Sequence, residues 1–88
     1  MICENILQEA KELVKGDRQE EYGDKLINHE NIAALWSIFL RKKITPHDAA
    51  MCMALVKVAR LMHARKQDSY IDLAAYAAIA AEINERTE

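Results

Sequence analysis

Residues 45–64 read TPHDAAMCMALVKVARLMHA, and this stretch opens with the clearest helix start in the chain. Thr45 is a favoured N-cap residue, and Pro46 suits the first helical position. Asp48 completes a Thr-x-x-Asp capping box, in which two backbone N–H groups are satisfied reciprocally. The sequence therefore predicts a helix that begins after Thr45 and continues to about Ala64.

This helix is apolar on nearly every side. Its apolar residues are Ala49, Ala50, Met51, Met53, Ala54, Leu55, Val56, Val58, Ala59, Leu61 and Met62. A helix of that kind needs neighbours all round, and one short chain hardly supplies them. We therefore expect a homo-oligomer, a dimer or higher, with this helix, the one before it or the one after it at the interface.

Two helices are predicted before this one. The first covers about residues 4–15, where apolar residues recur at helical spacing and Gly16 follows as a C-terminal cap. The second starts near Asn28, a good N-cap, and ends around Arg41. Between them, residues 16–24 hold both glycines, and we expect a loop or a short helix between two loops.

The last predicted helix begins at Asp68 or Ser69 and runs to about Asn84. Ser69 and Asp72 have the spacing of a second capping box, and a ridge of alanines follows that lets another helix approach closely. Four helices with short connections predict an all-α, compact four-helix bundle-like domain over residues 1–88, completed by oligomerisation.

Composition narrows the function classes. The 88 residues are 51% hydrophobic and 30% charged, with a net charge of -2, so nothing favours nonspecific binding of nucleic acid. The longest nearly apolar run, 73–81, is too short to span a membrane. Cys3 and Cys52 are isolated thiols, expected to be reduced in the cytoplasm, with Cys52 in the core.

Lys57 and Arg60 are the most informative charged pair. They lie three residues apart in an otherwise apolar helix, so they share a face and need a compensating anion or a route to water. One interpretation extends both side chains to water, or pairs them with Asp68 and Asp72 across the short turn. The other places a phosphate-bearing ligand against them. The two interpretations are compatible if the aspartates orient the cations.

Asp68 and Asp72 also have two interpretations. Both fit the first turn of a helix, where negative charge complements the helix dipole. Two carboxylates one turn apart can instead bind Mg²⁺, with Glu30 and either Glu20 or Glu21 completing the site. Asp48 carries the same ambiguity.

The aromatic residues and histidines point less clearly to chemistry. Tyr76 follows Asp72 by one helical turn and either packs in the core or stacks on a base. Trp36 is expected in the core or an interface. His29, His47 and His63 lack zinc-type spacing, so a solvated or capping role is expected for each.

The ordered set of segments resembles a family of small phage and prophage proteins of unknown function. The segments that carry the resemblance are Gly16-Asp17-Arg18, Tyr22-Gly23-Asp24, Asn28 to Ser37, Thr45 to Asp48, Lys57 to Arg60 and Asp68 to Ala78. Two positions depart from the family pattern: Ala75 stands where Gly is common, and His29 stands where Phe is usual.

That family is in turn distantly similar to the MazG-like all-α nucleotide pyrophosphatases. The similarity implies a helical oligomer with Mg²⁺ held by Glu-x-x-Glu on one helix and Glu-x-x-Asp on the next. Asp72 matches the last carboxylate, but Ser69 stands three residues earlier, and Ala33 stands three residues after Glu30. The resemblance therefore implies the fold and a nucleotide-type ligand more strongly than hydrolysis.

Three functions follow as hypotheses. The leading one is a phage-type protein in the host cytoplasm that binds, and thereby sequesters, a nucleotide or nucleotide-derived ligand. Phosphate would be held by Lys57, Arg60 and Arg18, and the base by Tyr76 or Tyr22. The second is a Mg²⁺-dependent nucleotide pyrophosphohydrolase. The third is a non-catalytic protein that serves assembly alone.

Overall fold

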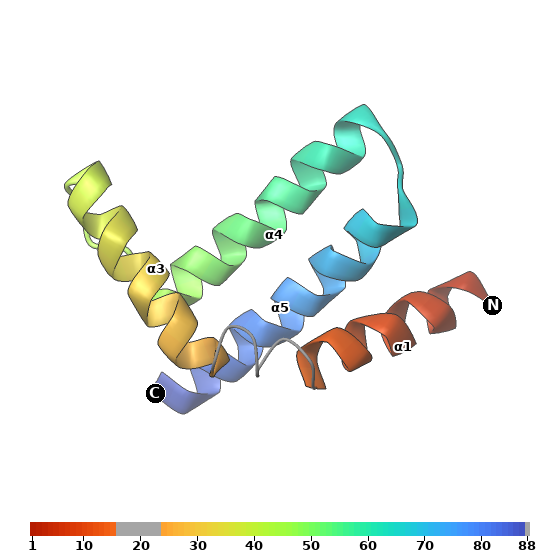
Figure 1. Cartoon of the computed structure of the whole chain (residues 1–88), viewed down its shortest axis with the longest axis horizontal. Helices are drawn as coiled ribbons and strands as arrows, with labels where there is room; N and C mark the ends of the chain where they lie inside the picture. The colour runs from red at the N-terminus through yellow and green to blue at the C-terminus, as the bar shows by residue number, and fades with distance from the viewer. Residues whose placement is uncertain (16–23, 88) are drawn as a thin grey trace.

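The protein is all-helical in the computed structural model, which describes residues 1–15 and 24–87 (Figure 1). The helices are α1 (Ile2–Lys15), α3 (Lys25–Leu40), α4 (Pro46–His63) and α5 (Gln67–Thr87). The described residues form no strand, so the all-α prediction is confirmed. The expected loop or short helix at 16–24 lies outside the described residues, apart from Asp24.

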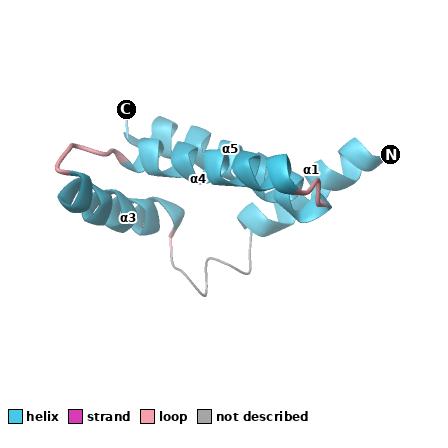
Figure 2. Cartoon of the chain, turned by 90° about the horizontal axis from the view of Figure 1, so that it is seen from above, coloured by secondary structure: helices cyan, strands magenta, loops and turns pink. Residues whose placement is uncertain are grey.

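The helices pack around α5. Helices α4 and α5 form an antiparallel pair and share the most extensive contact in the chain, while α1 packs on α5 and α3 crosses both members of the pair (Figures 1 and 2). Helices α1 and α3 do not touch each other. The arrangement is a helical bundle that stays open, because its two outer helices lie apart.

Small side chains dominate the core. One cluster joins Ala10 to Ile71 and Ala75 and ties α1 to α5. A second cluster joins Ala50 to Ala80 and Ile83 and ties α4 to α5. Apart from those two isoleucines, the buried apolar residues of the described chain are all alanines. Helices that meet through alanine approach closely, as the predicted alanine ridge implies, although only part of that ridge is buried.

The start of α4 is the one predicted from the sequence. The Asp48 N–H donates to Thr45 Oγ1 at 3.0 Å, and the Thr45 N–H donates to Asp48 Oδ2 at 3.1 Å. Pro46 occupies the first turn, and Ala64 caps the other end. The capping box at Thr45 and the end of the helix near Ala64 are therefore confirmed.

Two predicted helix starts are wrong. Helix α3 begins at Lys25 with Asp24 as its N-cap, so Asn28 lies inside the helix. Helix α5 begins at Gln67, which places Ser69 inside its first turn with its N–H donating to the Lys66 carbonyl. The second capping box is therefore absent. A side chain caps only the residue at which the chain enters the helix, and both helices begin before the predicted caps.

The open arrangement leaves much apolar surface uncovered. Exposed large apolar residues include Leu35, Ile38 and Phe39 on α3, and Met51, Leu55 and Met62 on α4. Cys52 is also exposed, so its expected place in the core is wrong. Trp36 is half-buried. None of the helices in the described residues is long and apolar enough to cross a membrane.

Candidate functional site

Lys57 and Asp72 form an ion pair between the two central helices. Lys57 Nζ lies 3.2 Å from Asp72 Oδ2, and the two side chains are only 13% and 27% exposed. Because α4 and α5 run antiparallel, a residue late in α4 faces one early in α5. Asp72 therefore supplies a compensating charge for Lys57. Asp68, the other predicted partner, is exposed and makes no ion pair with any described residue.

Arg60 follows Lys57 by one helical turn and stays exposed. Within residues 1–15 and 24–87 it has no ion-pair partner. A guanidinium that is always charged and carries five donors is well suited to bind phosphate. Lys57 and Arg60 therefore differ in their surroundings. Lys57 is paired with a carboxylate, whereas Arg60 is available to an external anion.

Tyr76 connects this ion pair to α3. It follows Asp72 by four residues, so both side chains leave the same face of α5. Its ring meets the ring of His29 edge to face, with centroids 6.2 Å apart and an interplanar angle of 75°. His29 is only 3% exposed, so the expected solvated or capping role is wrong.

His29 has one ring nitrogen bonded and one left over. Nδ1 lies 2.7 Å from the Lys25 carbonyl oxygen, which only accepts, so Nδ1 carries the hydrogen. In the neutral ring Nε2 is then a bare acceptor. Nε2 is buried and has no hydrogen-bond partner among the described residues. A buried polar atom without a partner is unusual in a native fold.

We call Arg60, Lys57, Asp72, Tyr76 and His29 the polar line. It runs from the exposed end of α4, across the ion pair on α5, to the buried face of α3. It offers cations at one end, an aromatic ring towards the other, and an unsatisfied acceptor at the buried end. Such a set can hold a flat, hydrogen-bonding group linked to an anion.

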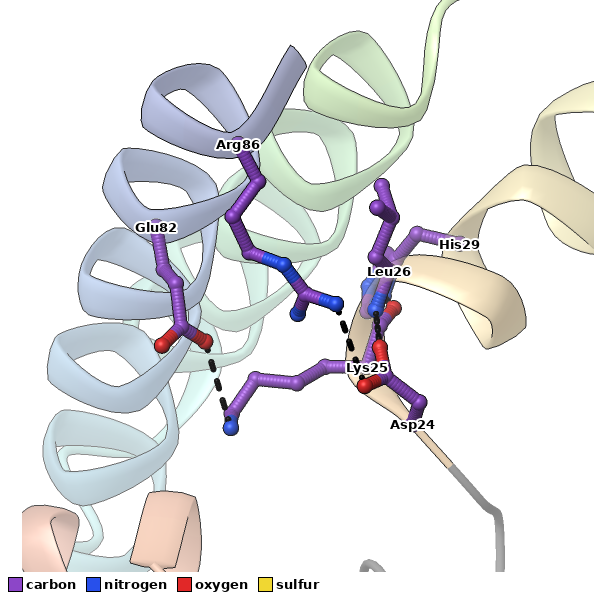
Figure 3. Close-up of polar contacts among 6 residues, drawn as sticks. All are labelled: Asp24, Lys25, Leu26, His29, Glu82 and Arg86. Carbon is purple, nitrogen blue, oxygen red and sulfur yellow. Dashed lines mark hydrogen bonds and ion pairs between the residues drawn. The ribbon is translucent and has the colours of Figure 1, made fainter.

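A second group of charges holds α3 against α5 (Figure 3). Asp24 Oδ2 accepts from Arg86 Nη2 at 3.1 Å, and Asp24 Oδ1 accepts from the Leu26 N–H at 2.8 Å. Lys25 Nζ lies 3.2 Å from Glu82 Oε2. This clamp fixes the first turn of α3, which carries the carbonyl that orients His29. Sequence spacing does not reveal these pairs, because nothing local links residues so far apart in the chain.

The clamp also shifts acid–base equilibria. The hydrogen bond from Arg86 holds the pKa of Asp24 below its usual value, and the Leu26 N–H acts in the same direction. The carboxylate in turn raises the pKa of the Arg86 guanidinium. At the start of α4, hydrogen bonds from the Thr45 backbone and hydroxyl hold the pKa of Asp48 below its usual value.

The predicted metal ligands are not gathered into one site. The described residues contain no group of three His, Cys, Asp or Glu side chains that could hold a metal ion. Glu30 and Asp68 are exposed, and Asp72 faces Lys57. The remaining predicted site residues Arg18, Glu20, Glu21 and Tyr22 lie outside the described residues, so their roles stay predictions.

An apolar groove lies apart from the polar line, between α1 and the first half of α5. Its volume is about 670 Å³, and its walls include Ile6, Leu7 and Leu73, with Arg65 and Tyr70 among the lining residues. The groove shares no residue with the polar line. None of the site residues predicted from the sequence lines it.

The fold and the polar line define a small all-helical protein in which α4 and α5 share the ion pair of Lys57 with Asp72, and α3 and α5 share the ring contact of His29 with Tyr76. The chain belongs to the family described as a domain of unknown function, DUF6378, whose model matches residues 5–84. It is 43% identical over 77 residues to the Gene 55 protein of Mycobacterium phage L5, and 40% identical over 85 residues to the Gene 55 protein of Mycobacterium phage D29. The resemblance to small phage proteins is thereby confirmed.

The aligned regions cover 85% and 96% of this chain but only 49% and 56% of the L5 and D29 proteins. The chain thus spans about half the length of the curated relatives it matches. No solved structure matches the chain.

Proposed function

We propose that the polar line binds a nucleotide or nucleotide-derived ligand and holds it without cleaving it. The observation that carries this proposal is the buried, unsatisfied Nε2 of His29 beside the ring of Tyr76. A buried acceptor without a donor does not stabilise a hydrophobic core. A nucleotide base has N–H donors for such an acceptor and a flat face for the ring.

The two ends of the polar line suit the two ends of a nucleotide. Arg60 provides a charged fork for phosphate, and Lys57 has three donors, of which Asp72 requires one. At the other end, Tyr76 provides a ring and His29 Nε2 an acceptor for a base. Arg18 and Tyr22 remain candidates for the same ligand. In a phage setting such binding would sequester a nucleotide in the host cytoplasm.

Holding is favoured over hydrolysis by the state of Asp72. A pyrophosphohydrolase of the MazG-like kind needs carboxylates free to bind Mg²⁺. Here Lys57 Nζ already neutralises Asp72 at 3.2 Å, and a metal ion would have to displace it. The enzyme therefore remains the alternative, and the MazG-like similarity supports only the fold and the class of ligand.

A protein that serves assembly alone is the second alternative. The exposed apolar side chains of α3 and α4 favour it, since monomers rarely leave large apolar patches uncovered. The two functions are compatible, because a protein that sequesters a ligand can also be an oligomer.

The test begins with the purified full chain. We expect mass spectrometry of the denatured protein to release an intact nucleotide, and calorimetric titration of the emptied protein to show binding. Arg60→Met is expected to weaken binding by roughly tenfold or more, the loss of a charge-assisted hydrogen bond, without lowering the melting temperature.

Lys43→Met is the matched control, because Lys43 is an exposed cation away from the polar line. It is expected to leave affinity unchanged. Release of pyrophosphate or a monophosphate during titration would establish the enzyme instead. The absence of any nucleotide response, together with a firm complex with another protein, would favour the assembly function.

A further inference from the structure

Helix α4 carries an unbroken apolar stripe on its solvent side. Met51, Leu55, Val58 and Met62 are all exposed, with Leu55 at 63% and Met62 at 85%. Their spacing of four, three and four residues is that of the seam between two paired helices. Arg60 lies two residues from both Val58 and Met62, so it projects from the opposite side of α4. The stripe is therefore separate from the polar line.

The chain exposes more surface than a monomer of its size should. Its accessible surface is 6563 Å², whereas a folded monomer of 10.0 kDa is expected to expose about 5,200 Å². The excess of about 1,300 Å² per chain is larger than the roughly 800 Å² that each partner buries in a standard interface. The excess covers the area that a stable dimer buries, and the exposed apolar side chains on both α3 and α4 contribute to it.

We propose that a second copy of this chain covers the stripe, with the two α4 helices packed antiparallel about a two-fold axis. In this register Met51 faces Met62 of the partner subunit, and Leu55 faces Val58 of the partner subunit. Each contact occurs twice, as an isologous interface requires. The proposal does not depend on the ligand, because the polar line lies on the other side of the helix.

The charges at the two ends of α4 fit this register. Antiparallel pairing of the stripe brings Asp48, in the first turn of α4, to the C-terminal end of the partner's α4, and Arg65 of the partner subunit lies two residues beyond that end. Both residues are exposed, and opposite charges at the rim of an interface favour one orientation over the other. A parallel pair would instead place Asp48 beside a second Asp48. The dipoles of the two helices also oppose each other in the antiparallel pair.

Helix α3 offers a matched control for the choice of face. Leu35 on α3 is 67% exposed, close to the value for Leu55, and it lies on a different helix. Leu55→Glu is expected to weaken the dimer by about a hundredfold or more, because each dimer contains the change twice. Leu35→Glu is expected to leave dissociation of this pair unchanged. Sedimentation or light scattering at micromolar concentration measures the dissociation of both variants.

Neither leucine is buried, so both variants are expected to remain helical. Circular dichroism checks this. A wild-type chain that stays a 10 kDa monomer would overturn the proposal. It would also be overturned if Leu35→Glu dissociated the oligomer while Leu55→Glu did not, because α3 would then be the interface.

Disulfide trapping tests the register in a background with Cys3 and Cys52 changed to serine. Residues 51 and 62 are eleven residues apart, or about 16 Å along the helix axis. Chains with Met51→Cys are expected to crosslink with chains carrying Met62→Cys, whereas neither is expected to crosslink with itself, since a disulfide spans less than about 7 Å between Cα atoms. Self-crosslinking of the Met51→Cys chain would show a parallel pair and overturn the register.

Discussion

Lys57 Nζ and Asp72 Oδ2 lie 3.2 Å apart, on helices that run in opposite directions. The lysine belongs to an otherwise apolar helix and is the less exposed partner. The carboxylate that compensates it comes from the next helix, so the pair also fixes the register of α4 against α5. One ion pair thus serves the fold and orients a cation at the end of the polar line.

Replacing Lys57 with Met is expected to lower the free energy of unfolding by about 1–2 kcal/mol, because it leaves a half-buried carboxylate without its partner. The loss is smaller than for a fully buried pair, since water still reaches Asp72. Urea unfolding at neutral pH measures it. In the double variant Lys57→Met, Asp72→Leu most of the stability should return. A single variant as stable as its parent would mean that Asp72 is not the anion that matters.

Asp24 predicts a loss of stability in acid. Its pKa is lowered in the folded state, chiefly by Arg86, so its contribution is complete above the unfolded value of about 3.9 and disappears as the pH falls through the folded pKa. Asp24→Asn should therefore be less stable than the parent at pH 7, with the difference shrinking as the pH falls below about 4. Thermal unfolding across this range measures the effect.

Asp68→Asn is the control for that experiment, because Asp68 is exposed and has no ion pair among the described residues. It should change the pH dependence little. If the two variants behave alike, the contact between Asp24 and Arg86 makes no net contribution in solution.

The capping box at Thr45 is expected to contribute measurably to stability. Thr45→Ala removes the acceptor for the Asp48 N–H and should lower the free energy of unfolding by about 1 kcal/mol. Ser69→Ala tests the same sequence pattern at a place where the structure forms no box, and it should change stability by less than about 0.5 kcal/mol. Urea unfolding of both variants decides which serine or threonine is a cap.

Magnesium provides the test of the metal prediction. We expect the melting temperature to be the same with and without millimolar Mg²⁺, because Asp72 is already engaged by Lys57. A ligand that binds only the folded state must raise that temperature. A rise in the parent that Asp72→Asn abolishes would instead support the Mg²⁺ site and strengthen the case for the enzyme.

Local signals in the sequence predicted the helices well. The start of α4 depends on three neighbouring residues, Thr45, Pro46 and Asp48, whose chemistry is complete within one turn. The predicted start at Asn28 failed because Asp24 is an equally good cap four residues earlier, and its hydrogen bond to Arg86 adds a long-range reason to begin there. Ser69 failed as a cap because α5 begins at Gln67, so Ser69 already lies within the first turn.

The candidate site was predicted only in part. Apolar residues surround Lys57 and Arg60 in the sequence, so at least one of the two cations was expected to be partly buried. A partly buried cation needs an anion, and this part of the site was therefore predicted. Nothing in the spacing shows which of Asp68 and Asp72 faces the lysine, because both lie in the first two turns of α5. The burial of His29 was missed because it depends on α3 crossing α5, which brings its ring against Tyr76.

The alanine core constrains how this sequence can vary. Ala50 and Ala80 belong to one buried cluster between α4 and α5, so a larger side chain at either position crowds the facing helix. Selection at these positions acts on volume more than on hydrophobicity, and glycine or serine is a nearer substitute than leucine. Homologous chains are therefore expected to keep small residues at these crossings.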